Sequence, residues 1–406
     1  MRTLAVLSLH TSPLAQPGTG DSGGMNVYVR ELVSSLAQAG VDCSVFTRRW
    51  RRDLPDVVDV EPGFRVVHVD AGPPSIDKDR LAEVVDDFAD GVLDHLAHRA
   101  VDAIHANYWL SGVAGHRLKH ELDVPLVSTF HTLARVKAET GDPEPERRVQ
   151  AEHAVMECSD AITASCTAEA DQLVALYGAR PERIQLVPPG VIHAFFSPGD
   201  RRGARAALGL GLDGAPLLLF VGRIQPLKGL DVAIGALAAL DRPDAQLVVV
   251  GGPSGPDGPT EAAKSMLLAD ELGVTDRIRW VEPQPHHLLA TYYRAADVCV
   301  VPSRSESFGL VALEAAACGT PVVAAAVGGL RTLVADGATG FLVEDRQPDA
   351  FARSIDALLR DSALARRMSH EAAARARGYT WSTTAARLRR LYADLAVRQP
   401  VDCNAA

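Results

Sequence analysis

The stretch that decides the fold runs from Pro302 to Pro321 and reads PSRSESFGLVALEAAACGTP. The residues before it, 297–301, form an apolar and β-branched run that predicts a short, buried parallel strand. Residues 309–318 predict a helix rich in Ala and Leu that ends at Gly319, and residues 320–326 predict the next strand. This order indicates an open α/β sheet, which binds ligands at the carboxyl ends of its strands.

Two carboxylates, Glu306 and Glu314, lie at that edge, in the loop and in the first turns of the helix. A carboxylate accepts two hydroxyl hydrogen bonds, and a vicinal sugar diol offers two. The backbone amides of the helix start, at Phe308, Gly309 and Leu310, can hold anionic or polar oxygens. Either Glu alone also fits a surface carboxylate, but the whole string favours a nucleotide-sugar site.

The length and composition predict two globular α/β domains. At 406 residues the chain is too long for one core, and two series of strands and helices follow one another. We expect one domain over residues 1–195, a second domain over 196–381 and a C-terminal helix at 382–406. Both are expected to be doubly wound and Rossmann-like, facing a cleft. The net charge of −10 argues against nucleic acid as a partner.

Other features indicate the cellular setting. No apolar run reaches membrane-spanning length, and the first residues are too short for the apolar part of a signal peptide. The six cysteines include no C-x-x-C pair, and Cys299 and Cys318 fall in predicted core. We therefore expect reduced thiols in a cytoplasmic protein. The sequence leaves open whether the chain forms a homodimer.

A glycine-rich loop at residues 10–24 contains Gly18, Gly20 and Gly23 in the spacing of the dinucleotide fingerprint. That fingerprint needs glycines directly after the strand, whereas about nine residues intervene here, so a nicotinamide dehydrogenase is only a minor alternative. Gly23 and Gly24 at the start of the next helix matter more, because glycine lets backbone amides approach an anion closely.

Charged and polar residues follow several other predicted strands. Arg223 and Lys228 flank a loop after the strand at 217–221 and can neutralise a diphosphate leaving group. His10 and His131 follow strands in the first half, where each fits a strand cap as well as a ligand contact. The chain has no D-x-D motif, so we expect no catalytic metal and no cofactor other than a nucleotide-sugar donor.

The E-x7-E spacing of Glu306 and Glu314 around Ser-Phe-Gly resembles the signature of retaining glycosyltransferase family 4, which has the GT-B fold. The resemblance implies that Glu306 contacts the transferred sugar and Glu314 the ribose diol. It also implies that residues 1–195 bind the acceptor, that residues 196–381 bind the donor, and that the last helix, 382–406, returns to the first domain. It implies a catalytic set of His131, Arg223, Lys228 and Glu306. It implies a donor-binding set of Gln16, Pro17, Gly23, Gly24, Arg223, Lys228, Glu306, Phe308, Gly309, Leu310 and Glu314.

Residues 10–29, 108–112, 131–134 and 222–228 resemble, more closely, a branch of that family that moves N-acetylglucosamine from UDP-GlcNAc to inositol 3-phosphate. Within that resemblance a Lys, a Tyr, a Thr and an Arg hold the acceptor phosphate, and two cations with two hydroxyls suit a phosphate monoester. The implied acceptor-binding set is His10, Asp21, Asn26, Lys78, Tyr108, Thr132 and Arg148. UDP-glucose and a GDP-sugar remain open as donors.

Three features depart from that branch: Ile192 replaces an expected Asp, Phe130 is bulkier than expected, and the helix from residue 112 is unusually basic through His116, Lys119 and His120. An antibiotic-type transferase with another sugar and acceptor, or a sucrose-phosphate-synthase-like activity, therefore stays open. A non-catalytic protein that binds sugar nucleotides also stays open on sequence alone.

Overall fold

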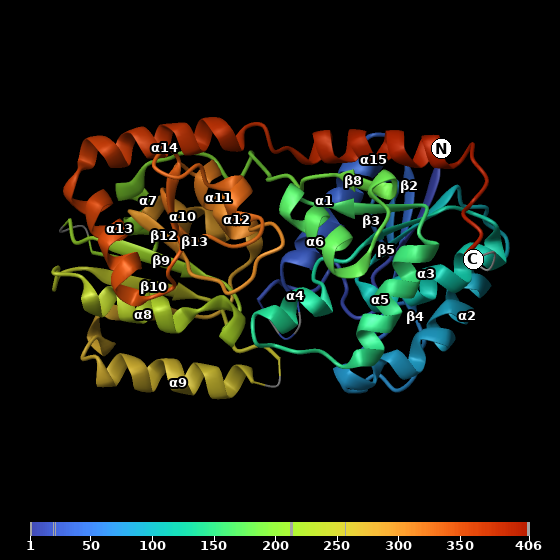
Figure 1. The fold of residues 1–406 in the computed structure, drawn as a ribbon, viewed down its shortest axis with the longest axis horizontal. Helices are drawn as coiled ribbons and strands as arrows, with labels where there is room; N and C mark the ends of the chain where they lie inside the picture. Colours follow the sequence, from blue (N-terminus) through green and yellow to red (C-terminus); the bar gives the residue numbers. More distant parts are fainter. Residues whose placement is uncertain (1, 19, 21, 212–213, 256, 404–406) are drawn as a thin grey trace. The chain divides into compact units, whose positions relative to one another are not determined.

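The computed structural model describes residues 2–18, 20, 22–211, 214–255 and 257–403 (Figure 1). The chain packs as two compact units. Unit 1 comprises Met1–Ala15, Met25–Pro189 and Trp381–Ala406, and unit 2 comprises Gln16–Gly24 and Gly190–Thr380. Each unit has its own mainly parallel sheet, which confirms the expected pair of α/β domains. The boundary between the units lies after Pro189, slightly before the expected boundary at 195. The glycine-rich segment Gln16–Gly24 belongs to unit 2.

The sheet of unit 1 has eight strands in the order β3-β4-β2-β1-β5-β6-β7-β8. All neighbours pair in parallel except β3, which runs antiparallel to β4 with a bulge between Asp59 and Glu61. The charge-rich stretch 48–63 predicts irregular structure, so the edge strand β3 corrects that prediction. Its Val residues at 57, 58 and 60 were the available signal. The strands are β1 (Thr3–Leu7), β2 (Asp42–Arg48), β3 (Val57–Glu61), β4 (Phe64–Val69), β5 (Ala103–Asn107), β6 (Leu126–Thr129), β7 (Ala161–Ala164) and β8 (Ile184–Leu186).

Helices cover both faces of this sheet. On β5, Ile104 packs into the core that α2 and α3 share, whereas its neighbour His105 points the other way and meets Tyr392 of α15. Figure 1 shows α15 and α2 on opposite sides of the sheet. The final helix α15 therefore belongs to unit 1, as expected. The helices are α1 (Gly24–Gln38), η1 (Lys78–Val84), α2 (Val85–Leu96), α3 (Trp109–Leu122), α4 (Ala134–Glu139), α5 (Glu146–Cys158), α6 (Thr167–Tyr177), η2 (Pro181–Arg183) and α15 (Trp381–Leu395).

The sheet of unit 2 has six parallel strands in the order β11-β10-β9-β12-β13-β14. Its strands are apolar on both faces: on β10, Leu247 and Val249 join one core cluster, and Val248 and Val250 join the other. This pattern is typical of a parallel sheet between two helix layers. The strands are β9 (Leu217–Val221), β10 (Gln246–Val250), β11 (Ile278–Val281), β12 (Val298–Val301), β13 (Val322–Ala325) and β14 (Gly340–Val343).

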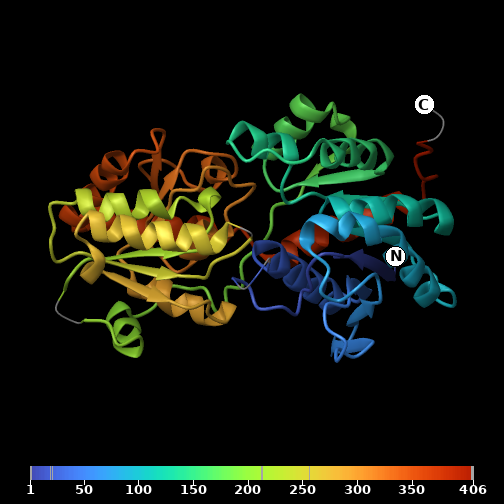
Figure 2. The same ribbon diagram turned by 90° about the horizontal axis from the view of Figure 1, so that it is seen from below.

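The helices of unit 2 divide between those two cores. Figure 2 shows α8 and α9 side by side over the sheet, and Figure 1 shows α11 and α14 on the opposite side. The Pro, Gly and charged residues of 196–216 predict a linker, but this segment contains a helix, α7, which Arg205 anchors through bonds to Ala295 and Asp297. The helices are α7 (Arg201–Ala207), η3 (Pro226–Lys228), α8 (Leu230–Ala239), α9 (Gly258–Glu271), η4 (Thr275–Arg277), η5 (His286–Leu288), α10 (Leu289–Ala295), α11 (Leu310–Ala317), α12 (Leu330–Leu333), α13 (Pro348–Arg360) and α14 (Ser362–Ala376).

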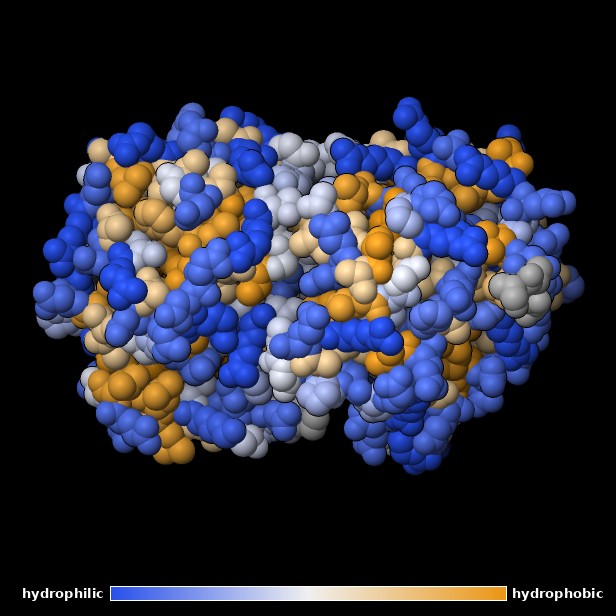
Figure 3. All heavy atoms as spheres, viewed as in Figure 1, coloured by the Kyte–Doolittle hydropathy of each residue, from blue (hydrophilic) through white to orange (hydrophobic). Residues whose placement is uncertain are grey.

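The outer surface mixes polar and apolar side chains (Figure 3). Exposed apolar residues of α9, including Met266 and Leu267, contribute to the orange area where Figure 1 places that helix. Within the part of the chain that the structure describes, no helix combines the length and the apolar character needed to cross a membrane.

Candidate active site

The loop between β12 and α11 carries Glu306, and glycines hold its backbone. The amide of Gly329, which follows β13, donates to the carbonyl oxygen of Glu306 at 2.8 Å. A Cβ on Gly328 would lie 2.1 Å from that same oxygen, and its φ of +44° is in the left-handed region. Only glycine fits there, so the neighbouring strand fixes the position of Glu306.

The Glu306 side chain meets Lys228 in the loop after β9. The Lys228 Nζ atom lies 2.7 Å from Glu306 Oε2, and the two side chains are 23% and 19% exposed. Gly229 permits this approach, because a Cβ on it would lie 2.4 Å from the carbonyl oxygen of Pro302. The pair is compact, charge-neutral and open to solvent, which suits contact with a polar ligand.

Arg223, the second cation, lies against the glycine-rich segment of unit 2. A Cβ on Gly23 would be 3.1 Å from Arg223 Nε, so the backbone of this segment passes directly over the guanidinium group. Arg223 Nη1 donates to Ser254 Oγ at 3.4 Å, and the Ser254 hydroxyl donates to the carbonyl oxygen of Gly20. The structure therefore joins Arg223 and the Gly23 backbone, two parts of the expected donor set.

Other members of the donor set lie on the same segment. Gln16 donates from Nε2 to the carbonyl oxygen of Pro283 at 2.9 Å, and Pro17 follows it. Gly24 begins α1, and a Cβ on it would lie 3.5 Å from Leu310 Cδ1 at the start of α11. Gly24 is therefore close to the helix start expected to hold the nucleotide.

Glu314 is only 5% exposed, and protein groups contact both of its carboxylate oxygens. His286 Nε2 lies 2.6 Å from Oε1, and the Tyr293 hydroxyl donates to Oε2 at 2.9 Å. Burial and the Glu314 charge raise the pKa of Tyr293 well above its usual value, so Tyr293 stays a donor. Each carboxylate oxygen has two lone pairs, so Glu314 keeps acceptor capacity for a diol.

The start of α11 offers backbone amides rather than side chains. The ring of Phe308 is buried, with its centroid 5.9 Å from that of Tyr379, so only its amide can face a ligand. Gly309 precedes the first helical residue, Leu310, and has a φ of +103°. This backbone turn leaves the first amides of α11 without partners in their own helix, as ligand binding at a helix start requires.

In unit 1 the structure brings together three of the four residues expected to hold a phosphate. Arg148 is 2% exposed and its guanidinium lies 5.0 Å from the Tyr108 ring. Its Nη2 donates to Thr132 Oγ1 at 3.0 Å. Its other donors are also used: Nε bonds Glu152 and Nη1 pairs with Glu144, each at 2.8 Å.

Lys78, the fourth residue, is exposed at the start of η1. Arg147 donates from Nη2 to the carbonyl oxygen of Asp79 at 2.6 Å, so the segment that carries Lys78 lies beside the start of α5. The two adjacent arginines thus have different roles: Arg147 ties η1 to α5, and Arg148 points into the buried cluster.

Sequence reasoning missed Lys137 of α4, which joins the Arg148 cluster. Its Nζ lies 2.9 Å from Asp142 Oδ2 and also pairs with Glu144. Glu144 therefore binds Lys137 and Arg148 at once. The sequence shows that the loop between α4 and α5 is rich in charged residues. The structure adds that one of them, Glu144, pairs with both Lys137 and Arg148.

His131 and Tyr108 follow β6 and β5 with φ values of +62° and +76°. Such conformations are uncommon for residues other than glycine and occur frequently at functional sites. His131 Nε2 lies 2.9 Å from Asn107 Oδ1. Burial, followed by the charges of His105 and His10, lowers the pKa of His131 to about 3. His131 is therefore a neutral imidazole near pH 7.

The remaining acceptor candidates lie near β1. The His10 ring lies 4.3 Å from the Tyr108 ring, at the edge of the same cluster. Asn26 donates both amide hydrogens within the loop, to Thr11 Oγ1 and to the Ser12 carbonyl oxygen, each at 2.6 Å. Asn26 thus holds the loop that carries His10. Asp21 lies outside the described residues.

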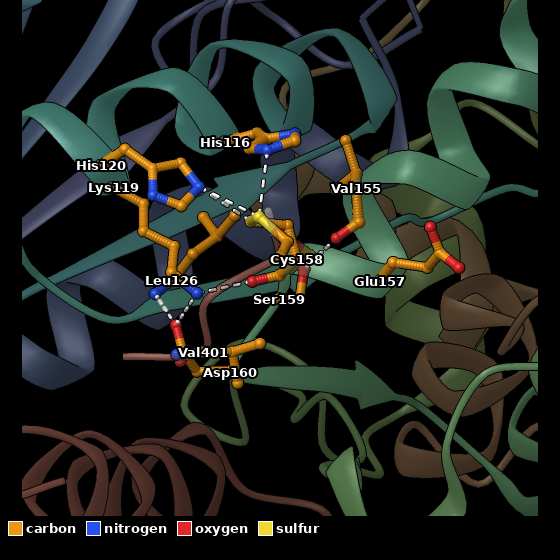
Figure 4. Close-up of a disulfide and its surroundings, with 12 residues drawn as sticks. His116, Lys119, His120, Leu126, Val155, Glu157, Cys158, Ser159, Asp160 and Val401 are labelled. Carbon is orange, nitrogen blue, oxygen red and sulfur yellow. Dashed lines mark hydrogen bonds and ion pairs between the residues drawn. A yellow bond between two sulfur atoms is a disulfide. The ribbon is translucent and has the colours of Figure 1, made fainter. Parts of the chain in front are cut away.

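The cysteines correct one expectation. Cys158 at the end of α5 and Cys403 form a disulfide, with their Cα atoms 5.0 Å apart (Figure 4). The other four, which are Cys43, Cys166, Cys299 and Cys318, are free and buried. The expectation of six reduced thiols was wrong for this pair because 245 residues separate the two cysteines, and no local pattern records their meeting.

Two parallel α/β units, one with paired carboxylates and cations at its strand ends, define a GT-B glycosyltransferase that uses a nucleotide sugar. Residues 23–190 match the family model "Glycosyl transferase 4-like domain", and residues 209–375 match "Glycosyl transferases group 1". The D-inositol 3-phosphate glycosyltransferase of Xylanimonas cellulosilytica is 49% identical, with 98% of each chain covered. That of Streptosporangium roseum is 48% identical, with 96% of this chain and 92% of the relative covered. The chain belongs to this glycosyltransferase family.

Solved structures agree with this assignment. Sucrose-phosphate synthase from Thermosynechococcus elongatus superposes with a TM-score of 0.91 at 35% identity, covering 97% of this chain and 99% of that one. HepE from Anabaena, solved in complex with UDP-glucose, has a TM-score of 0.78 at 20% identity, covering 97% and 100%, and shares the fold. The dehydrogenase alternative is therefore excluded, and the chain is a transferase.

Proposed function

We propose that this chain is a retaining glycosyltransferase that moves N-acetylglucosamine from UDP-GlcNAc to 1D-myo-inositol 3-phosphate. The assignment of the acceptor rests on one observation: Arg148, Thr132 and Tyr108 lie together in unit 1. A guanidinium group with neighbouring hydroxyls suits a phosphate monoester. The D-inositol 3-phosphate glycosyltransferases at 48–49% identity support the same acceptor.

On the donor side, the proposal assigns the leaving diphosphate to Lys228, Arg223 and the Gly24 amide. Their fixed positive charge stabilises the negative charge that develops as the glycosyl phosphate bond breaks. Lys228 is already held 2.7 Å from Glu306, so Glu306 orients the sugar while Lys228 reaches the phosphate. Glu314 uses its remaining lone pairs for the ribose diol.

On the acceptor side, the Glu144 carboxylate occupies the proposed phosphate position until the acceptor displaces it. Glu144 is on a loop with its side chain 22% exposed, whereas Glu152 is fully buried and stays with Arg148. A phosphate dianion that displaces Glu144 would meet the freed donors of both Arg148 and Lys137. An anionic ligand in place of an anionic side chain keeps the local charge nearly balanced, which lowers the cost of the exchange.

The proposed chemistry needs no protein nucleophile. The departing phosphate accepts the proton of the attacking inositol hydroxyl on the same face of the sugar, and the configuration at the anomeric carbon is retained. A general acid near neutral pH needs a pKa near neutrality. With a pKa of about 3, His131 does not meet this requirement and instead holds the transferred sugar by hydrogen bonds.

The proposal includes a cytoplasmic location and no cofactor beyond the donor. The four buried free cysteines agree with a reducing compartment, in which Cys158 and Cys403 would also be reduced. A sucrose-phosphate-synthase-like activity is the second candidate, because the structure at 35% identity carries that name. Both candidates use a phosphorylated acceptor, so the experiment must vary the donor and the acceptor together.

A matrix of purified substrates tests the proposal. UDP-GlcNAc, UDP-glucose and GDP-glucose are each combined with inositol 3-phosphate, free inositol and a fructose phosphate, and products are read by mass spectrometry. We expect the highest kcat/KM for UDP-GlcNAc with inositol 3-phosphate, and nuclear magnetic resonance should show a retained anomeric configuration. Preferred transfer to a fructose phosphate, or no preference for the phosphorylated inositol, would replace the proposal by one of its alternatives.

A further inference from the structure

A cluster of two histidines and two cysteines lies in unit 1 and includes none of the residues assigned above. His116 and His120 come from α3, Cys158 ends α5, and Cys403 lies beyond α15 near the C-terminus. Figure 4 shows the two histidine rings turned toward the sulfur atoms. One nitrogen or sulfur atom from each of the four residues lies within 4.8 Å of all the others.

The nitrogen–sulfur distances within this cluster are close to those of a metal coordination sphere. His120 Nε2 is 3.0 Å from Cys403 Sγ and 3.3 Å from Cys158 Sγ, and His116 Nε2 is 3.3 Å from Cys403 Sγ. In tetrahedral zinc sites, Zn–S bonds of about 2.3 Å and Zn–N bonds of about 2.0–2.1 Å place nitrogen and sulfur ligands roughly 3.5 Å apart. Once the disulfide is reduced, the two sulfurs must move apart to bind an ion, whereas the histidine nitrogens already lie near the distance that a ligand needs.

A disulfide alone does not account for the histidines. A bridge between Cys158 and Cys403 needs no imidazole, and its sulfurs carry no charge that would attract one. His116 and His120 are four residues apart on one helix, the spacing that places two imidazoles on one ion in helical metal sites. The basic character of this helix, noted in the sequence, is thereby explained by two ligands on one face.

We propose that in the reduced chain His116, His120, Cys158 and Cys403 bind one zinc ion as a structural site. Each cysteine releases its proton to solvent on binding, and the ion keeps its oxidation state. Two thiolates and two neutral imidazoles balance the charge of Zn²⁺, and four protein ligands leave no open position for a substrate. The disulfide is the oxidised alternative of the same two sulfurs and cannot bind the ion.

Hydrogen bonds outside the cluster already hold both cysteines in place. Lys119 Nζ donates to the carbonyl oxygen of Cys158 at 2.6 Å and pairs with Asp160 Oδ2 at 2.8 Å. Asp160 Oδ1 accepts from the amide of Val401 at 2.6 Å, which draws the C-terminal segment to this point. The backbone near Cys403 is thus fixed independently of the sulfur–sulfur bond, and the site is preorganised.

The test uses the full chain purified in a non-thiol reductant, with Zn²⁺ itself as the probe. Competition with a chromophoric chelator should give one ion per chain, and Co²⁺ in its place should give the absorption bands of a tetrahedral thiolate site. His120→Ala, at an exposed position, and Cys403→Ser should weaken affinity at least about 100-fold, beyond the 10–100-fold typical for groups that only support metal ligands. His153→Ala, an exposed histidine of α5, is the matched control and should bind like wild type.

Limited proteolysis of the C-terminal segment gives a second readout of zinc binding. Arg398 is exposed between α15 and Cys403, so trypsin can cleave there when the segment opens. Zinc should slow this cleavage in wild type and in His153→Ala but not in His120→Ala. The proposal is overturned if a chain whose six thiols all titrate as reduced binds no zinc, or if His120→Ala binds it as tightly as wild type.

Discussion

The ammonium nitrogen of Lys228 lies 2.7 Å from Glu306 Oε2, although 78 residues separate the two in sequence. They meet because β9 and β12 are neighbours in the sheet, and because Gly229 lets the two loops touch. In the proposed mechanism, this pair joins the cation that stabilises the leaving diphosphate to the carboxylate that orients the sugar.

We expect Lys228→Ala to lose turnover about 10²–10³-fold, because preorganised charge contributes most when the diphosphate departs. The pair is partly exposed, so its removal should change the free energy of unfolding little. Steady-state kinetics with UDP-GlcNAc measure the loss. Lys264→Ala, at an exposed position on α9, is the control and should behave like wild type. Near-normal turnover of Lys228→Ala would contradict the proposal that Lys228 stabilises the leaving diphosphate.

We expect Glu314→Gln to weaken UDP binding roughly 10–100-fold, since a charge-assisted hydrogen bond contributes about 1.5–3 kcal/mol. The amide keeps an oxygen for one of the two partners, His286 or Tyr293, so most of the local packing should persist. Calorimetric titration with UDP measures the change, beside Glu371→Gln on the exposed face of α14. Equal affinity in both variants would show that Glu314 serves the fold alone.

We expect Arg148→Lys to raise the KM for inositol 3-phosphate on the order of 10–100-fold and to leave UDP affinity unchanged. Lysine keeps a charge beside the buried Glu152, which an alanine would leave unpaired. Arg99→Ala, at an exposed position outside this cluster, is the control and should leave the KM unchanged. If both variants change the KM alike, the phosphate lies elsewhere.

For Glu144 we expect the opposite effect on the KM, because its carboxylate occupies the proposed phosphate position when no acceptor is bound. Glu144→Gln removes the carboxylate that competes with a phosphate for Arg148 and Lys137, so the KM for inositol 3-phosphate should fall. The effect on free inositol should be small, since that acceptor has no phosphate to exchange. Initial rates with both acceptors measure this difference. A higher KM for the phosphorylated acceptor would instead make Glu144 a direct ligand.

Stability should fall on the acid side of neutrality because of buried histidines. Burial lowers the pKa of His105 to about 3, whereas an unfolded histidine has a pKa near 6.5. Between these values the unfolded chain binds more protons, so the stability present above about pH 6.5 is lost as the pH falls toward 3. The slope is up to about 1.4 kcal/mol per pH unit for each such group.

Urea unfolding at pH 7.5 and pH 5 measures this slope. His105→Gln keeps a polar side chain for Tyr392 and Thr129 but cannot be protonated, so its loss of stability between the two pH values should be smaller. The comparison uses the difference between pH values, and any constant destabilisation by the substitution cancels. An unchanged slope would mean that His105 is not neutral in the fold.

The order of strands and helices, and with it the fold class, was accessible from sequence. Short apolar runs rich in β-branched residues, such as Val298–Val301, favour buried strands, and glycines such as Gly319 end the helices that follow. The E-x7-E string at Glu306 also allowed a donor site to be predicted, because its residues lie within one strand-loop-helix unit. The edge strand β3 and the short helix α7 were missed, since each is short and rich in charged residues.

Only the tertiary structure decided which distant side chains meet. The pairs of Arg148 with Glu144 and Glu152 are local, at i,i+4 spacing, but its contact with the Tyr108 ring is not. His105 of β5 likewise meets Tyr392 of α15 across 287 residues. Cys158 meets Cys403 because the segment after α15 returns to α5. Local sequence encodes periodicity and turns through short-range sterics, whereas pairing across more than a hundred residues depends on how whole elements pack, which leaves no local pattern to detect.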